Sequence, residues 1–64
     1  MDSTQLYSKT LRAIDEAVSD IEEYILNGAP ATEVEYHKAV AKRQGLLDAR
    51  GILEDKFRRA DSED

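Results

Sequence analysis

The segment of residues 28–35 constrains the fold more than any other part of this chain, because it interrupts a sequence that otherwise favours helix. Gly28 can adopt the left-handed backbone conformation that ends a helix without a steric cost. Pro30 lacks the N–H group that a continuing helix needs, and its ring disfavours the helical conformation at Ala29. The sequence therefore predicts one helix that ends at this segment and a second helix that begins in it.

The start of the second helix is marked by a capping box. Thr32 lies three residues before Glu35, so the Thr32 hydroxyl can accept a hydrogen bond from the Glu35 N–H while the Glu35 carboxylate accepts one from the Thr32 N–H. At the start of the chain, Asp2 or Ser3 can cap the first helix, and Gln5 follows Asp2 at the same spacing.

We expect helices over about residues 3–27 and 32–60, with residues 61–64 as a frayed acidic tail. The predicted fold is an all-α antiparallel two-helix hairpin, and residues 1–64 form a single domain. A chain of 64 residues without cysteine can neither bury a large core nor be stapled by disulfides. We therefore expect the hairpin to self-associate, most simply as a homodimer that forms a four-helix bundle.

The first predicted helix carries a regular apolar seam, with spacings that alternate between four and three residues. The seam consists of Tyr7, Leu11, Ile14, Val18, Ile21 and Ile25. This heptad pattern is typical of a helix that packs lengthwise against another helix. The residues that widen the seam on one flank are Ala13, Ala17 and Tyr24.

The apolar pattern of the second predicted helix is wider and less regular. One edge consists of Tyr36, Val40 and Leu47, and the other of Ala39, Leu46, Leu53, Phe57 and Ala60. The residues expected to pack on the first helix are Tyr36, Val40, Leu46, Leu47, Leu53 and Phe57.

Arg43 and Arg50 lie seven residues apart, between the two apolar edges. Their alkyl stems can cover the core while the guanidinium groups reach carboxylates of the first helix. For Arg43 we expect Glu16 and Asp20 as partners, within the chain or across a dimer. The alternative is that the two arginines bind an acidic partner protein.

Gly45 and Gly51 each cost about 1 kcal/mol relative to alanine inside a helix, so some feature should offset them. A smooth strip of small residues would let another helix approach closely. The predicted contact face for an oligomer or partner consists of Val34, Ala41, Gly45, Ala49 and Ile52. The alternative is a tolerated kink near Gly45.

The net charge of −5 is unevenly distributed. Residues 1–35 hold eight acids and two bases (−6), residues 36–60 hold seven bases and three acids (+4), and residues 61–64 add −3. The simplest interpretation is that an acidic helix pairs with a basic one, and we expect no direct contact with nucleic acid. The charges that could face a partner are Asp15, Glu16, Asp20, Glu23, Arg43 and Arg50.

The sequence holds no recognisable catalytic or cofactor site. A metal site would have to combine His37 with Glu33, four residues before it, and such pairs are common by chance. Residues 45–51 lack the spacing of a phosphate-binding loop. We therefore expect no enzyme activity, no metal and no cofactor.

Neither a membrane span nor a signal peptide is expected. No apolar run approaches the roughly 20 residues of a membrane span. The first residues have neither the basic nor the apolar segment of a signal peptide. The sequence thus predicts a cytoplasmic protein that does not contact a membrane.

Residues 35–49 resemble a pattern found in small uncharacterised helical-hairpin proteins of tailed bacteriophages. The matching positions are Glu35-Tyr36, then Gly45-Leu46, then Ala49, after a turn that contains glycine. The resemblance implies a viral origin, a structural or accessory role and a location in the host cytoplasm or the virion. It implies no catalytic residues.

The functional prediction is a non-enzymatic protein–protein interaction module, an oligomeric structural, assembly or accessory protein of phage type. Its expected partners are a second copy of itself and another protein. The alternative is a small acidic inhibitor of a host protein, which presents the acidic face of the first helix as a decoy or as a mimic of nucleic acid.

Overall fold

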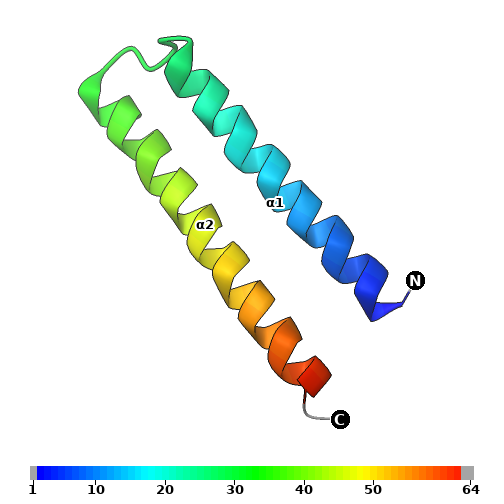
Figure 1. The fold of residues 1–64 in the computed structure, drawn as a ribbon. Coiled ribbons are helices and arrows are strands. Elements are labelled where there is room, and N and C mark those ends of the chain that lie inside the picture. The colour runs from blue at the N-terminus through cyan, green and yellow to red at the C-terminus, as the bar shows by residue number, and fades with distance from the viewer. Residues whose placement is uncertain (1, 63–64) are drawn as a thin grey trace.

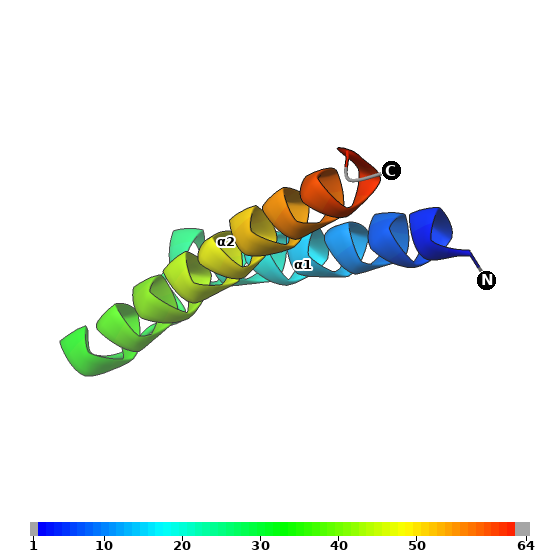
Figure 2. The same cartoon turned by 90° about the horizontal axis from the view of Figure 1, so that it is seen from below.

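The computed structural model describes residues 2–62 and contains two helices, α1 (Ser3–Leu26) and α2 (Glu33–Ser62). The helices lie side by side and antiparallel, in a hairpin that measures 50 × 18 × 13 Å (Figure 1). Viewed along a perpendicular direction, they cross at a shallow angle (Figure 2). The predicted all-α hairpin is confirmed.

The C-terminal end of α2 differs from the prediction. The helix continues to Ser62 instead of ending near Ala60, because no glycine or proline follows Ala60 to interrupt it. A frayed tail from Asp61 onwards is therefore wrong for residues 61 and 62. Residues 63–64 lie outside the described part of the chain.

The turn has the geometry that Gly28 predicts. Gly28 has a φ of +70°, and its N–H donates to the carbonyl of Ile25 over 3.1 Å. The N–H of Ala29 donates to the carbonyl of Tyr24 over 3.2 Å. These two bonds form a Schellman motif, which satisfies carbonyl groups that the end of α1 would otherwise leave unpaired.

Both helices are capped by side chains. The Asp2 carboxylate accepts from the Gln5 N–H over 2.8 Å at the start of α1. At the start of α2, the Thr32 hydroxyl accepts from the Glu35 N–H over 3.1 Å, as predicted. The Glu35 carboxylate accepts from the Ala31 N–H over 3.0 Å, not from Thr32, because this long side chain reaches one residue past the cap.

The two helices meet along two heptad seams. The seam of α1 is the predicted one, with Val18 at its centre and 8% exposed. The shielded residues of α2 also follow a four–three alternation once the arginines are counted. Those on the seam are Ala39, Arg43, Leu46, Arg50, Leu53 and Phe57, and Leu47, Glu54 and Asp55 beside it are partly shielded as well. At the open end of the hairpin, the rings of Tyr7 and Phe57 stack with centroids 4.0 Å apart and planes 6° apart.

Two residues expected in the core stay exposed. Tyr36 is 45% exposed and Val40 is 40% exposed. They lie beside the α2 seam, on an edge that a hairpin of two helices has no third element to cover. The seam positions next to this edge are held by Arg43 and Arg50, not by apolar residues.

The hairpin buries little apolar surface. Among the side chains that the structure describes, Val18 is the one buried hydrophobic residue. The large hydrophobic residues that remain exposed are Leu6, Tyr24, Leu26, Val34, Tyr36, Val40 and Ile52. Over the described range, neither helix combines the length and the hydropathy that crossing a membrane requires.

Candidate functional site

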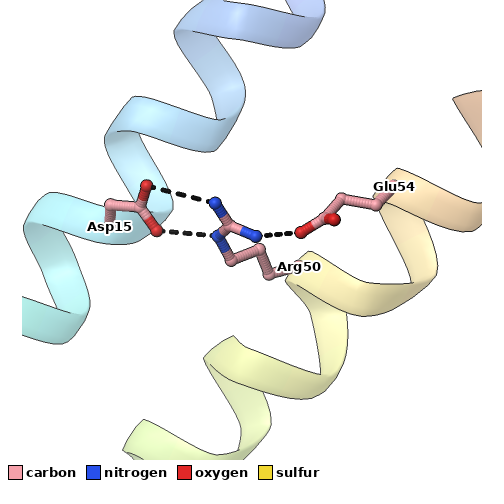
Figure 3. Close-up of polar contacts among 3 residues, drawn as sticks. All are labelled: Asp15, Arg50 and Glu54. Carbon is pink, nitrogen blue, oxygen red and sulfur yellow. Dashed lines mark hydrogen bonds and ion pairs between the residues drawn. The ribbon is translucent and has the colours of Figure 1, made fainter.

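One side of the hairpin carries ion pairs between the helices. Arg50 of α2 donates from Nε to Asp15 Oδ1 of α1 over 2.8 Å, and its Nη1 pairs with Glu54 one turn further along α2 (Figure 3). Arg43 donates from Nη2 to Glu22 Oε2 over 2.8 Å. We call this side the ion-pair face, and define it by Asp15, Glu22, Arg43, Arg50 and Glu54.

The predicted partners of Arg43 are wrong, although its predicted role is right. The guanidinium group pairs with Glu22, and not with Glu16 or Asp20. Helical side chains lean towards the N-terminus of their own helix. In an antiparallel hairpin, Arg43 therefore leans towards the turn and α1 carboxylates lean away from it, so the arginine meets an acid closer to the turn.

The electrostatic environment of Arg50 favours its charged form. The Asp15 carboxylate accepts a hydrogen bond from the guanidinium group and raises the pKa of Arg50 above its ordinary value, and the charge of Glu54 adds to this effect. The Arg50 side chain is still 34% exposed, so water screens both interactions. This cluster holds the helices in register and presents no unpaired charge for chemistry.

The ion pairs fix the register of the two helices. Arg43 and Arg50 are seven residues apart, and so are their partners Glu22 and Asp15. A step of seven residues is close to two helical turns, and so returns to nearly the same side of a helix. Seven residues towards the C-terminus of α2 therefore correspond to seven residues towards the N-terminus of α1.

The opposite side of the hairpin carries charged residues near the turn, where Glu35, Lys38 and Lys42 line a groove, and small residues further along. Tyr24 of α1 lines the same groove. Applying the seven-residue step to both helices places Ala17 beside Gly45 and Ala49. These alanine and glycine residues are small, and a Cβ built on Gly45 would meet no atom within 4 Å.

A second step places Thr10 beside Ile52 and Lys56. Tyr24 and Ala17 each follow an ion-paired acid, Glu22 or Asp15, by two residues, so they flank the α1 seam from the other side. We call this side the small-residue face. Its small and apolar residues are Leu6, Ala13, Ala17, Tyr24, Gly45, Ala49 and Ile52, and the same side carries the polar residues Thr10, Glu35, Lys38, Lys42 and Lys56.

The sequence had assigned these residues to two separate surfaces. The sequence predicts Ala13, Ala17 and Tyr24 on a flank of the first helix and the contact face on the second. The hairpin brings the first group to the same side as Gly45, Ala49 and Ile52, whereas Val34 and Ala41 are not part of the small-residue face. All members of the predicted face are exposed: Val34, Ala41, Gly45, Ala49 and Ile52. Helix α2 runs uninterrupted through Gly45 and Gly51, and its ribbon shows no sharp bend along its length (Figure 1).

The candidate charges divide into two groups. Asp15, Arg43 and Arg50 pair within the chain, so only part of their charge is available to another molecule. Glu16, Asp20 and Glu23 are exposed along the outer surface of α1, and no ion pair joins them to another described residue.

His37 lies near a single carboxylate. Its Nε2 is 3.4 Å from Glu33 Oε1, one turn earlier, and both side chains are exposed. Between residues 2 and 62, no three potential metal ligands among His, Cys, Asp and Glu converge.

Comparison with protein family models, with curated proteins and with solved structures gave no match. The resemblance of residues 35–49 to tailed-phage proteins therefore stays a prediction.

Proposed function

We propose that this protein is a non-enzymatic interaction module that self-associates, most simply as a dimer of hairpins. The observation that carries this proposal is the small core: Val18 is the one buried hydrophobic residue among the described side chains, while large residues such as Leu26 and Ile52 remain 85% and 62% exposed. A second hairpin would cover part of this apolar surface and make burial contribute to stability.

The total surface area supports the same proposal. The single chain exposes 5057 Å², whereas a compact folded monomer of 7.2 kDa is expected to expose about 4,100 Å². The surplus of about 960 Å² is of the same order as the roughly 800 Å² that each partner buries in a standard interface.

Within this proposal, the protein acts as a structural, assembly or accessory component that binds itself and another protein. The resemblance to phage proteins adds a viral setting, with the host cytoplasm or the virion as its location. Nucleic acid and membranes are not among the proposed partners.

Sedimentation equilibrium at micromolar concentrations tests the proposal. We expect a mass of about 14.4 kDa, twice the 7.2 kDa of one chain. A helical species that stays at 7.2 kDa up to several hundred micromolar would contradict the proposal. Circular dichroism on the same samples distinguishes a folded monomer from an unfolded chain.

A second candidate function is inhibition of a cationic host protein. The exposed acids of α1 favour it, since Glu16 and Glu23 lie two turns apart on the outer surface and have no ion-pair partner in residues 2–62. A nucleic-acid-binding protein retained from a lysate on the immobilised hairpin should then be displaced by duplex DNA. The double variant Glu16→Lys/Glu23→Lys should lose this protein and keep the mass of the wild type. Retention by both forms would dismiss the decoy function.

A further inference from the structure

We infer that the turn end of the ion-pair face binds a basic amphipathic helix of another protein. The binding surface consists of Leu26 of α1 and of Tyr36 and Val40 of α2, and we call it the turn patch. This inference rests on the proposed interaction function and specifies the partner that is not a second copy of the chain.

The Glu22–Arg43 ion pair shows that the three side chains of the turn patch lie on one side of the hairpin. Leu26 lies four residues after Glu22, whereas Val40 and Tyr36 lie three and seven residues before Arg43. Residues three, four or seven apart share one face of a helix. Leu26 and Val40 are therefore level with each other, one turn closer to the loop than the ion pair, and Tyr36 lies one turn further still.

The turn patch presents apolar surface that the chain itself does not cover. Leu26 is 85% exposed, the highest value among the large hydrophobic residues described as exposed, and Tyr36 and Val40 are 45% and 40% exposed. Beside Leu26, an open groove is lined by Glu22, Ile25 and Arg43. An amphipathic helix fits such a surface, because its apolar side chains can enter the groove while its axis follows α1 and α2.

The charges that border the turn patch are mainly negative. The charged residues within one helical turn of its members on the same helix face are Glu22, Glu23, Glu33 and Arg43. Arg43 pairs with Glu22, so the acids that remain are Glu23 and Glu33. His37 lies 3.4 Å from Glu33, and it offsets that charge only when it is protonated.

The lysines near the turn lie on the other side of α2. Lys38 follows Tyr36 by two residues and Lys42 follows Val40 by two residues, which is more than half a helical turn. Both lysines line the groove on the small-residue face, together with Glu35. They therefore leave the acidic border of the turn patch in place, and this border complements lysine or arginine residues on a bound helix.

A second copy matches this border poorly in a symmetric contact. In a two-fold contact, the same surface of each subunit meets its counterpart. Glu23 and Glu33 would then lie close to the same two acids of the other copy, and the like charges would repel. A helix with one apolar side and basic flanks covers Leu26 and also brings positive charge to the acids.

A synthetic peptide tests the inference. The probe is a fluorescently labelled helix of roughly 18 residues, with leucine at helical spacings and lysine elsewhere. One control has the same composition with leucine and lysine in strict alternation, and the other has glutamate in place of lysine. By fluorescence anisotropy at physiological ionic strength, we expect the probe to bind the hairpin at least about tenfold more tightly than either control. Equal binding of either control, or no binding of the probe, would overturn the inference.

A matched pair of variants tests the location. Leu26→Gln and Ile52→Gln each replace an exposed aliphatic side chain, 85% and 62% exposed, by a polar residue that helices accept. Leu26→Gln should weaken binding of the probe at least about fivefold, because it removes the centre of the turn patch. Ile52 lies twelve residues beyond Val40, so Ile52→Gln should weaken binding less than about twofold. Equal losses in the two variants would overturn the assigned surface.

Sedimentation equilibrium of the same proteins separates this inference from self-association. A dimeric Leu26→Gln that has lost the probe would support both. If wild type is a dimer and Leu26→Gln is a monomer, a second copy covers the turn patch, which would overturn the inference and leave self-association intact. A monomeric wild type that binds the probe through Leu26 would support the inference and contradict the proposed dimer.

Discussion

Arg43 and Arg50 show how single residues define the packing of this hairpin. Each occupies a seam position on α2, where its alkyl stem covers apolar neighbours while its head pairs with Glu22 or Asp15. Partly exposed ion pairs add little to stability, but their geometry matches only the observed register and therefore favours it. A slip of one helix by a turn would leave both arginines without these partners.

Replacing Arg50 by lysine should make the pairing sensitive to alkaline pH. Asp15 raises the pKa of Arg50 in the folded state, so its stabilising effect is present below the ordinary arginine pKa and is lost only as the pH rises through the raised value. The effect of a lysine with the same partner would begin to fall as the pH rises above the ordinary lysine pKa of about 10.4, and would be lost through its own raised folded-state pKa.

We therefore expect the melting temperature of Arg50→Lys to fall further below that of the wild type at pH 11 than at pH 8. Thermal melts followed by circular dichroism at both pH values measure this difference. The variant Arg58→Lys, which belongs to no inter-helix ion pair described here, serves as the control. A constant gap between Arg50→Lys and wild type would contradict the prediction.

The helices and their ends follow from local signals in the sequence. Gly28 has the left-handed backbone that a helix terminator requires, and Asp2 and Thr32 accept the predicted capping bonds. These features depend on residues only three or four positions apart, so the sequence is enough to predict them.

The pairing of the two elements was harder to predict. The heptad pattern of α2 includes Arg43 and Arg50. It is therefore not visible when only the apolar residues of the sequence are considered. The partner of Arg43 depends on the lean of side chains along both helices, and the joining of Ala17 with Gly45 on one face depends on the inter-helix register. The spacing of residues within one helix determines neither the lean of the side chains on the other helix nor the register between the two helices.

Gly28 and Gly51 should respond in opposite directions to alanine. Gly28→Ala forces a side chain into a left-handed conformation, which costs about 1–2 kcal/mol. Gly51→Ala adds a better helix former in open space and should stabilise the hairpin by up to about 1 kcal/mol. Urea denaturation at one protein concentration measures both free energies of unfolding. Destabilisation by Gly51→Ala would show that its missing side chain serves a contact outside the single chain.

The whole molecule has the proportions of half a bundle. It is 50 Å long but only 18 and 13 Å across, so even the seam residues lie near the surface and a single hairpin cannot exclude water from both sides of its seam. The proposed dimer solves this problem by adding a second layer.

This view predicts that stability depends on concentration. Association that involves only the folded state stabilises it by mass action, so the melting temperature should rise as the protein concentration increases from about 5 to 500 µM. A wild-type melting temperature that does not change with concentration would count against self-association.

The stacked rings of Tyr7 and Phe57 also have a kinetic consequence. They join positions fifty residues apart in the chain, so closing this contact confines a far longer loop than any contact beside the turn. During refolding, the helix–helix contacts should therefore form first beside Gly28 and last at the aromatic pair. On heating a Tyr24→Phe/Tyr36→Phe variant, in which Tyr7 is the one tyrosine left, the near-ultraviolet tyrosine signal should disappear before the helical signal does.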